Sequence, residues 1–322
     1  PAFKLTWVLC IMALPIFGTF FYIYVKAQIG TRYIGKRLET LKDETEEYMR
    51  QDMEIIDAMK KSKLANKNLS YYLGKHLGFP TYGNTRLEYY PLGEDKFEAL
   101  KRELRKAEHF IFMEYFIVEG GEMWDEIRHI LEEKVTEGVE VRFMYDGMCS
   151  ISKLPSDYPW YLRRRGIRCK VFNPINPIVS TIQNNRDHRK ICVIDGKVGF
   201  TGGINLADEY INRRERFGHW KDTAIMLEGD AVRSLTIMFL QMWNIGEKKI
   251  NDYDKYLLPP AQEFDPKDGY VLPYGDNPYD NENVGEEVYF HILNHAKEYV
   301  HIMTPYLILD NEMTKTLARV AK

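Results

Sequence analysis

Apolar segments alternate with amphipathic segments through the middle of the chain, and this alternation restricts the possible folds more than any other feature. A helical pattern at residues 96–107 precedes an apolar, aromatic run at 110–118. A second helical pattern ends near Gly138 and precedes an apolar run at 140–145, and "WYLRRRGIRCKVFNP" repeats the same order of helix and strand. Alternating helices and strands are typical of α/β proteins with a mostly buried sheet. We therefore predict an α/β fold.

Further along the chain, residues 191–194 predict a short buried strand, and "NLADEYI" and "AVRSLTIMFLQMWNIG" predict two more helices. Residues 251–283 are rich in Pro, Asp, Asn and Gly, which predicts a long linker. With 322 residues, 45% of them hydrophobic, the chain can form a large core in more than one domain or in one duplicated domain.

The pattern begins again after the linker, with a helix, an apolar strand and a second helix. A constant offset of 191 residues superimposes three positions of the two strands, namely Ile111, Tyr115 and Ile117 on Ile302, Tyr306 and Ile308. This match predicts a duplicated fold. The alternative is that any two strands of an α/β protein look alike.

The N-terminal region contains 21 uncharged residues, 5–25, which at about 1.5 Å per residue could span the roughly 30 Å of a bilayer core. We predict a transmembrane helix here, with Pro15 and Gly18 as tolerated kinks. Because the chain starts at Pro1, we expect further sequence upstream. Basic residues follow the run and predict a cytoplasmic location for the bulk of the protein; they are Lys26, Arg32, Lys36, Arg37, Lys42 and Arg50.

The region after this run, 34–63, has apolar positions at helical spacing among many charges. It predicts an amphipathic helix that either lies on the lipid surface or acts as a solvated connector. The predicted organisation is a transmembrane helix in 1–27, a helical connector in 28–80, a first domain in 81–250, the linker in 251–283 and the start of a second domain in 284–322.

Charge and cysteine content exclude some functions. The net charge of −3 gives no global support for nucleic-acid binding. The four cysteines are widely spaced without a CxxC pair, which argues against a zinc cluster or a disulfide scaffold and fits a reducing compartment.

The stretch "NNRDHRKICVIDGKVGFTGGIN" carries the candidate chemistry. On a strand, residues two apart project to the same side, so His188 and Lys190 should lie together. A neutral imidazole can attack a phosphorus atom, and the neighbouring ammonium can neutralise the charge that develops on the phosphate oxygens. Each residue alone also has an ordinary structural explanation. Metal binding by His188 is disfavoured, since no second ligand lies at a suitable spacing, and we expect no cofactor.

A second candidate element follows the strand. Asp195 starts a tight Asp-Gly turn, and Gly202 and Gly203 precede the predicted helix of "LADEYI". Glycines at a helix N-terminus leave backbone N–H groups open to a phosphate, and Asn205 could cap the helix or reach the phosphate itself.

These residues resemble the HxKx4D motif of the phospholipase D superfamily: His188-x-Lys190, four residues, Asp195, six residues, then Gly202-Gly203-x-Asn205. With "EYFIVEGGEMWDEI", "GHWKDTA" and "TPYLILDNEM", the chain is similar to the membrane-anchored bacterial cardiolipin synthases. The resemblance implies a duplicated α/β/α sandwich in which two such motifs meet at one active site.

The resemblance also implies a reaction without a cofactor, in which one phosphatidylglycerol passes its phosphatidyl group to a histidine and a second accepts it to form cardiolipin. His188 would be the nucleophile or its acid/base partner, Lys190 and Asn205 would hold the phosphate, and Asp195 would be a supporting carboxylate of the motif. The chain has one HxKx4D motif, and the counterpart of His188 would fall near residue 379, beyond Lys322. We therefore expect an incomplete synthase, truncated at both ends.

Three other hypotheses stay open. A phospholipase D hydrolase would use water in place of the lipid acceptor. A single-motif nuclease would complete its site as a homodimer, although the mild negative charge counts against it. A non-catalytic membrane protein would use the same pocket to bind anionic headgroups.

Overall fold

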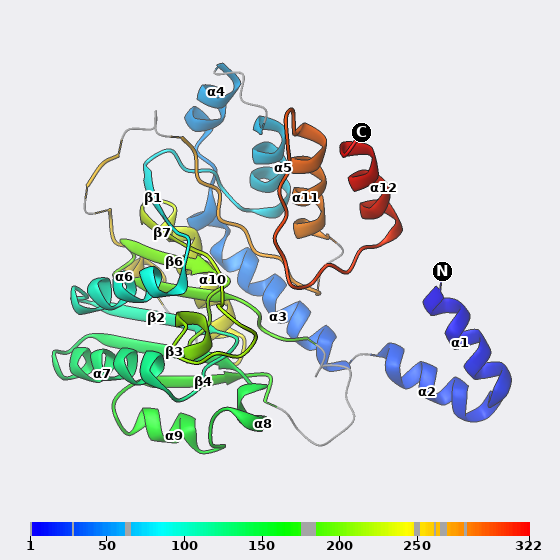
Figure 1. The fold of residues 1–322 in the computed structure, drawn as a ribbon, viewed down its shortest axis with the longest axis horizontal. Coiled ribbons are helices and arrows are strands. Elements are labelled where there is room, and N and C mark those ends of the chain that lie inside the picture. The colour runs from blue at the N-terminus through cyan, green and yellow to red at the C-terminus, as the bar shows by residue number, and fades with distance from the viewer. Residues whose placement is uncertain are drawn as a thin grey trace.

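The computed structural model describes residues 2–27, 29–61, 66–174, 185–247, 252–260, 262–264, 269–279 and 282–322. A seven-stranded sheet with strand order β1-β7-β6-β5-β2-β3-β4 forms the body (Figure 1). The strands are β1 (Thr85–Tyr90), β2 (Phe110–Tyr115), β3 (Glu140–Asp146), β4 (Arg168–Phe172), β5 (Lys190–Ile194), β6 (Val198–Gly202) and β7 (Ala224–Gly229).

The helices lie on both sides of this sheet and in the terminal regions (Figure 1). The α-helices are α1 (Ala2–Ala13), α2 (Pro15–Ala27), α3 (Ile29–Thr45), α4 (Met53–Lys61), α5 (Lys67–Leu77), α6 (Gly93–Arg105), α7 (Glu122–Thr136), α8 (Cys149–Ser152), α9 (Tyr158–Arg163), α10 (Val232–Asn244), α11 (Val284–His295) and α12 (Asn311–Val320). Short 3-10 helices are η1 (Glu46–Met49), η3 (Asp208–Ile211) and η4 (Asp254–Tyr256).

The sheet is mixed. Strand β3 pairs in parallel with β2 and β4, and the other neighbours pair antiparallel. In the β2–β5 pair, Lys190 lies opposite Tyr115 and Ile191 lies opposite Glu114. Since successive side chains of a strand alternate between faces, this register places Lys190 and Glu114 on opposite faces of the sheet.

Each face of the sheet is covered by its own core. On one face, α6 and α7 cover the sheet, Leu100 and Trp124 are fully buried, and the Trp124 ring stacks on Phe143 of β3 with centroids 4.6 Å apart. On the other, α10 packs on the sheet and buries Phe239, whose ring stacks on Phe112 with centroids 4.7 Å apart. The predicted α/β fold is therefore confirmed. Strands β1 and β7, which complete one side of the sheet, were not predicted.

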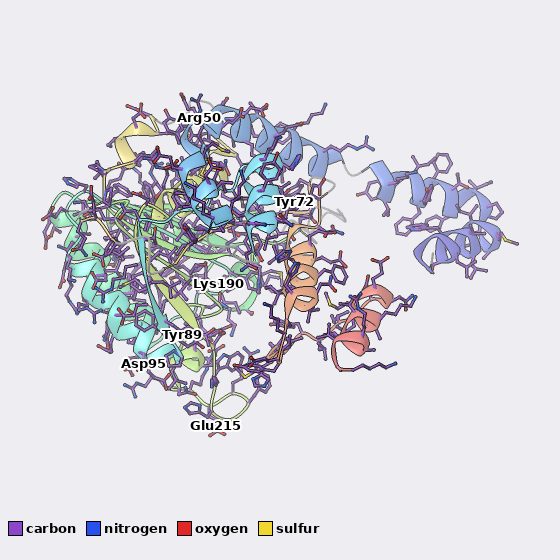
Figure 2. All side chains as sticks on the ribbon, turned by 90° about the horizontal axis from the view of Figure 1, so that it is seen from above. Arg50, Tyr72, Tyr89, Asp95, Lys190 and Glu215 are labelled. Atoms are coloured by element: carbon purple, nitrogen blue, oxygen red, sulfur yellow. The ribbon has the colours of Figure 1, made fainter. Side chains whose placement is uncertain are left out.

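The N-terminal apolar run differs from the prediction. The structure breaks it near Leu14 into α1 and α2, which pack on each other and stand apart from the body (Figures 1 and 2). The Trp7 ring lies 5.6 Å from that of Phe21, and a side chain at Gly18 would press on the backbone of α1. Within the described residues, no helix has the length and apolar character needed to cross a bilayer, so the structure does not show the predicted transmembrane helix. Pro15 explains the break, because it lacks a backbone N–H and disfavours a helical residue before it.

The connector is helical, as predicted, but it is divided. Helix α3 ends at Thr45, η1 follows, and α4 and α5 come next in place of one continuous amphipathic helix. Leu41 and Leu73 are buried against the body, so this region contributes to the α10 side of the core. The linker region adds Tyr256, whose ring packs on Phe112 at 5.0 Å.

The C-terminal region contains α11 and α12, the two helices predicted there. The described residues 301–310 between them form no strand, contrary to the prediction. Ile302, Tyr306 and Ile308 are 52%, 72% and 91% exposed. A strand needs a neighbour for its backbone hydrogen bonds, and none of the seven strands pairs with this segment.

Candidate active site

His188 lies directly before β5 and is exposed to solvent on one side. Its ring packs against Phe116, with ring centroids 4.8 Å apart. The pKa of His188 lies below its ordinary value because of partial desolvation and the nearby Lys190 charge, with Asp187 acting in the opposite direction. The imidazole is therefore neutral at neutral pH, as a nucleophile must be.

Lys190 is the first residue of β5 and is buried within the body (Figure 2). Its ammonium lies 5.5 Å from the Phe116 ring centroid and donates a hydrogen bond to the His188 backbone carbonyl. Burial lowers the pKa of Lys190 to about 8, and the charges of Asp187 and Asp222 oppose this shift. The structure thus brings His188 and Lys190 together on one aromatic ring.

Asp195 lies at the opposite end of β5, where its φ of 53° starts the turn to β6. Its carboxylate accepts hydrogen bonds from the backbone N–H groups of Glu108, His109 and Phe110, at 2.8, 2.8 and 2.7 Å. Asp195 thus fixes the connection from α6 to β2. The structure does not bring this carboxylate to His188.

Gly202 and Gly203 are packed against the start of β7. Gly202 has a φ of 152°, and a side chain there would overlap the Thr223 backbone. A side chain at Gly203 would overlap the carboxylate of Asp222, and the Gly203 N–H already donates to the Thr223 carbonyl at 3.0 Å. In this structure Gly202 therefore makes room for the Thr223 backbone, and Gly203 makes room for Asp222.

Asn205 is buried and ties two segments together. Its side-chain oxygen accepts a hydrogen bond from the Ile117 N–H at 2.9 Å, and its amide nitrogen donates to the Tyr210 hydroxyl at 2.8 Å. The predicted helix after it is reduced to the single 3-10 turn η3, which has no side-chain cap in the described structure. The predicted helix is therefore absent at these described residues, and the role of Gly202, Gly203 and Asn205 toward a phosphate stays a prediction.

Two charged residues beside Lys190 were missed as site residues. Asp222, from "GHWKDTA", faces Lys190 and Lys96, and burial raises its pKa despite these two positive charges. Lys96 on α6 is buried, and its ammonium lies 3.2 Å from the Tyr115 hydroxyl. Burial lowers the pKa of Lys96 to about 8. An Asp next to a Lys at the start of a strand was visible in the sequence, but nothing in the sequence placed it against Gly203.

The segment that carries His188 is attached to the body by Asp146, the last residue of β3. The Asp146 carboxylate accepts a hydrogen bond from the Asp187 N–H at 2.9 Å and pairs with Arg186 at 3.4 Å. Asp146 is fully buried. This attachment explains why His188 has a defined position although it precedes the strand.

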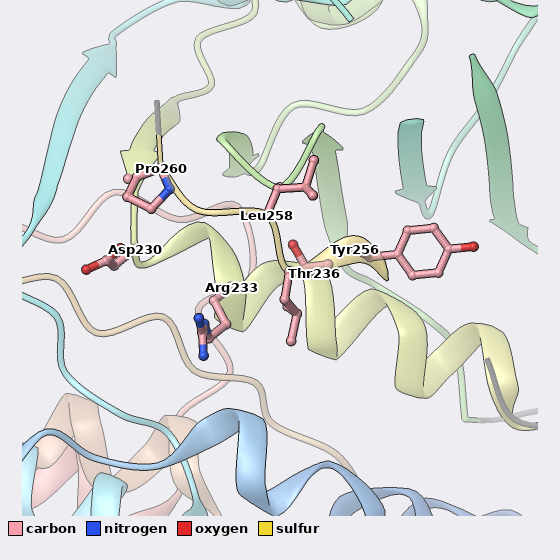
Figure 3. A pocket seen from close by; sticks show the side chains of 9 residues that line it. Asp230, Arg233, Thr236, Tyr256, Leu258 and Pro260 are labelled. Carbon is pink, nitrogen blue, oxygen red and sulfur yellow. The ribbon is translucent and has the colours of Figure 1, made fainter. Parts of the chain in front are cut away.

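Two cavities lie elsewhere. A cavity of about 20 Å³, lined in part by Asp230, Arg233 and Tyr256, has room for one water molecule (Figure 3). A hollow of about 720 Å³ lies between α11, residues 300–310 and α12, and it is lined mainly by apolar side chains. Neither is lined by His188 or Lys190.

Comparisons with known proteins agree with the motif. Residues 100–243 match the family described as "Cardiolipin synthase, PLD-like domain". An "Uncharacterized protein" of Streptococcus mutans is 52% identical over 318 residues, which cover 99% of this chain and 68% of that protein. A "Cardiolipin synthase" of Geobacillus thermodenitrificans is 33% identical over 332 residues, which cover 98% of this chain and 63% of that protein.

Among solved structures, NucT from Helicobacter pylori matches with a TM-score of 0.39 and 14% identity, over 50% of this chain and 96% of that chain. The chain spans less than two thirds of the length of the Geobacillus relative. The matched domain includes the six predicted site residues, His188, Lys190, Asp195, Gly202, Gly203 and Asn205. The chain belongs to the cardiolipin synthase group of the phospholipase D superfamily.

Proposed function

We propose that this chain carries one half of the active site of a membrane phosphatidyltransferase that makes cardiolipin from phosphatidylglycerol. A nitrogen of a catalytic imidazole attacks the phosphorus of one phosphatidylglycerol and forms an N–P bond. The bond from phosphorus to the glycerol oxygen breaks, and that oxygen takes up a proton as glycerol leaves. The hydroxyl of a second phosphatidylglycerol then gives up its proton and attacks the phosphorus, and the N–P bond breaks to release cardiolipin.

The observation that carries this proposal is the pairing of His188 and Lys190 on Phe116. The lowered pKa of His188 keeps its imidazole neutral near pH 7, while Lys190, with a pKa of about 8, is still mostly charged there. A neutral nucleophile beside a cation suits attack on an anionic phosphodiester. In this assignment Lys190 turns from the His188 carbonyl to the phosphate when substrate binds.

In this proposal the other four predicted site residues act indirectly and do not contact the substrate. They are Asp195, Gly202, Gly203 and Asn205. Their contacts in the structure are with the backbone, Asp222 and Tyr210. We propose that they maintain the architecture around His188, and that Asp222 balances the charge of Lys190. The duplicated organisation is also part of the proposal, since the reaction needs a nucleophile and an acid/base partner and a second motif would supply the other histidine.

The membrane location belongs to the proposal because both substrates are lipids. Helices α1 and α2 expose apolar side chains, and contact with lipid would remove these side chains from water. They include Leu5, Leu9, Ile16, Phe17 and Phe20. The basic residues that follow α2 favour the cytoplasmic side for the catalytic part.

The proposal is tested with the intact protein in vesicles that contain phosphatidylglycerol. We expect wild-type protein to form cardiolipin and glycerol, and His188→Ala to lose this activity by more than 100-fold. His129→Ala is the matched control, because His129 lies on the exposed surface of α7, and it should retain wild-type turnover. Full activity of His188→Ala contradicts the proposal.

Product analysis separates the two alternatives. A hydrolase would release phosphatidic acid and glycerol without cardiolipin. A non-catalytic headgroup-binding protein would bind the vesicles and leave phosphatidylglycerol unchanged. If the wild-type protein gives either of these results, the transferase assignment is wrong and the corresponding alternative takes its place.

A further inference from the structure

Glu114 is a buried acid for which the proposed mechanism has no use. It lies on β2, on the face of the sheet opposite to Lys190, and its residue exposure is 0%. Both of its carboxylate oxygens are buried and accept no hydrogen bond from a donor in the described part of the chain. An isolated buried carboxylate is strongly disfavoured, so such a group normally holds a proton or finds a partner.

The neighbour of Glu114 is another carboxyl group, that of Asp187, which acts on it and raises its pKa. Asp187 is 3% exposed. One of its oxygens accepts the Arg189 N–H at 3.2 Å, and the other is buried without a donor among the described residues. Two carboxylates are both acceptors, so a hydrogen bond between them requires that one carries a proton.

The surroundings decide which of the two acids holds the proton. Asp187 receives backbone hydrogen bonding from Arg189, and its charge favours the protonated form of His188. Arg189 is the cation that acts on Glu114, while Asp187 acts against its ionisation. The other charged or titratable groups that face the pair are Asp146, Arg186, Lys190 and Tyr279.

The balance of these charges favours Glu114 as the acid that holds the proton. Arg186 is paired with Asp146 and Lys190 acts on Asp187, which leaves Arg189 as the cation that acts on Glu114. Burial, reinforced by the Asp187 charge, raises the pKa of Glu114 well above its ordinary range. Because two neighbouring carboxylates are not both stable as anions in a dry interior, the more buried acid is the one that remains protonated.

This pair is connected to the candidate nucleophile through the chain itself. Asp187 directly precedes His188, and its backbone N–H already attaches the segment to the Asp146 carboxylate. We propose that Glu114 is a positioning residue: as a protonated acid it donates a hydrogen bond to Asp187 and so holds His188 over Phe116. The catalytic part of this inference rests on the proposed role of His188, whereas the protonation of Glu114 does not.

Protonation is tested through stability, with no lipid substrate. The unfolded chain releases the Glu114 proton at an ordinary acid pKa, while the folded protein retains it to higher pH. Between these two pKa values the folded state binds more protons, so this group makes the wild-type protein less stable as pH rises. Glu114→Gln removes the proton and keeps a neutral hydrogen-bond donor. Its unfolding equilibrium constant relative to wild type should therefore fall by up to about 10-fold per pH unit in this window.

The experiment compares the urea unfolding midpoints of wild type, Glu114→Gln and Glu215→Gln at pH 5.5, 6.5 and 7.5. These pH values are about one unit apart, and all lie above the ordinary pKa of a glutamic acid side chain. Glu215 is exposed on a loop at the edge of the body and serves as the matched control (Figure 2). The midpoint of Glu114→Gln should rise relative to wild type with increasing pH, and that of Glu215→Gln should follow wild type. If the difference in unfolding midpoint between Glu114→Gln and wild type is the same at all three pH values, Glu114 is not protonated in the folded protein and the inference is wrong.

Positioning is tested separately by kinetics of the intact protein. Glu114→Gln should keep kcat within about 3-fold of wild type, and Glu114→Ala should lower kcat at least 10-fold with a smaller change in KM, since the lost hydrogen bond orients a catalytic group. Equal losses in both variants overturn the positioning role. If Glu114→Ala does not fold, Glu114→Leu and the Gln variant make the same comparison. Absence of any wild-type transferase activity would refute the proposed function and leave the stability result as the test of this inference.

Discussion

Asp222 occupies the space that a side chain at Gly203 would fill. The carboxylate faces two buried lysines, Lys190 and Lys96, from this position. The glycine is therefore a packing requirement of a buried charge cluster, and one member of this cluster, Lys190, donates a hydrogen bond to the His188 backbone carbonyl.

The first prediction concerns this contact. Gly203→Ala should displace the Asp222 carboxylate and destabilise the protein by about 1–3 kcal/mol, as expected for overpacking. It should also reduce transferase activity, because Lys190 loses its counter-charge. Urea unfolding and cardiolipin formation measure the two effects. Gly120→Ala is the control, since a side chain there meets no described atom within 4 Å; equal behaviour of the two variants would contradict the assigned contact.

The second prediction is a bell-shaped pH dependence of kcat/KM. Activity should rise with pH as His188 loses its proton, with a midpoint below the ordinary histidine value of about 6.5, because its pKa is lowered. Activity should fall again near pH 8 as Lys190, with a pKa of about 8, loses its charge. Initial rates on vesicles from pH 5 to 9, a range of about four units around these values, measure both limbs. A flat profile through this range would show that neither group titrates in the rate-limiting step.

The third prediction tests the role of Phe116. Phe116→Ala should remove part of the desolvation at His188 and raise its pKa toward the ordinary value, so the acid limb moves to higher pH. NMR titration of the histidine ring measures this shift without substrate. Phe217→Ala removes an aromatic ring that is 78% exposed and should leave the His188 titration unchanged. No shift in Phe116→Ala would mean that the ring does not set the environment of His188.

The fourth prediction separates Asp195 from the chemistry. Asp195→Ala leaves three backbone N–H groups without their carboxylate partner and should destabilise the protein by about 2–5 kcal/mol. Turnover per folded molecule should stay within about 3-fold of wild type, because this carboxylate lies at the far end of β5. Thermal or urea unfolding gives the first quantity, and initial rates below the unfolding transition give the second. A stable variant with strongly reduced turnover would place Asp195 in the catalytic machinery.

The sequence alone was sufficient to predict the central elements of the fold. The apolar run of β5 and the periodicity of α7 and α10 are local patterns, and local patterns decide where such elements form. Strand β1 was missed because it carries the charged residues Arg86 and Glu88 and exposes Leu87 and Tyr89. An edge strand of this kind has no clean alternation of apolar and polar residues, and only its pairing with β7 identifies it.

The sequence by itself also determined that His188 and Lys190 lie two residues apart at the start of an apolar run, and that this run forms a strand; in the structure Lys190 begins β5 and His188 precedes it. Tertiary structure decided what surrounds them. Phe116, Asp222 and Glu114 come from other strands and loops, and their distances from β5 follow from sheet register and packing. It also separated the motif residues, because a strand of five residues carries Asp195 roughly 16 Å along its axis from Lys190. The spacing of two residues along a strand determines whether their side chains point to the same face. The burial of these side chains, the charges around them and their hydrogen-bond partners depend on which segments meet across the sheet.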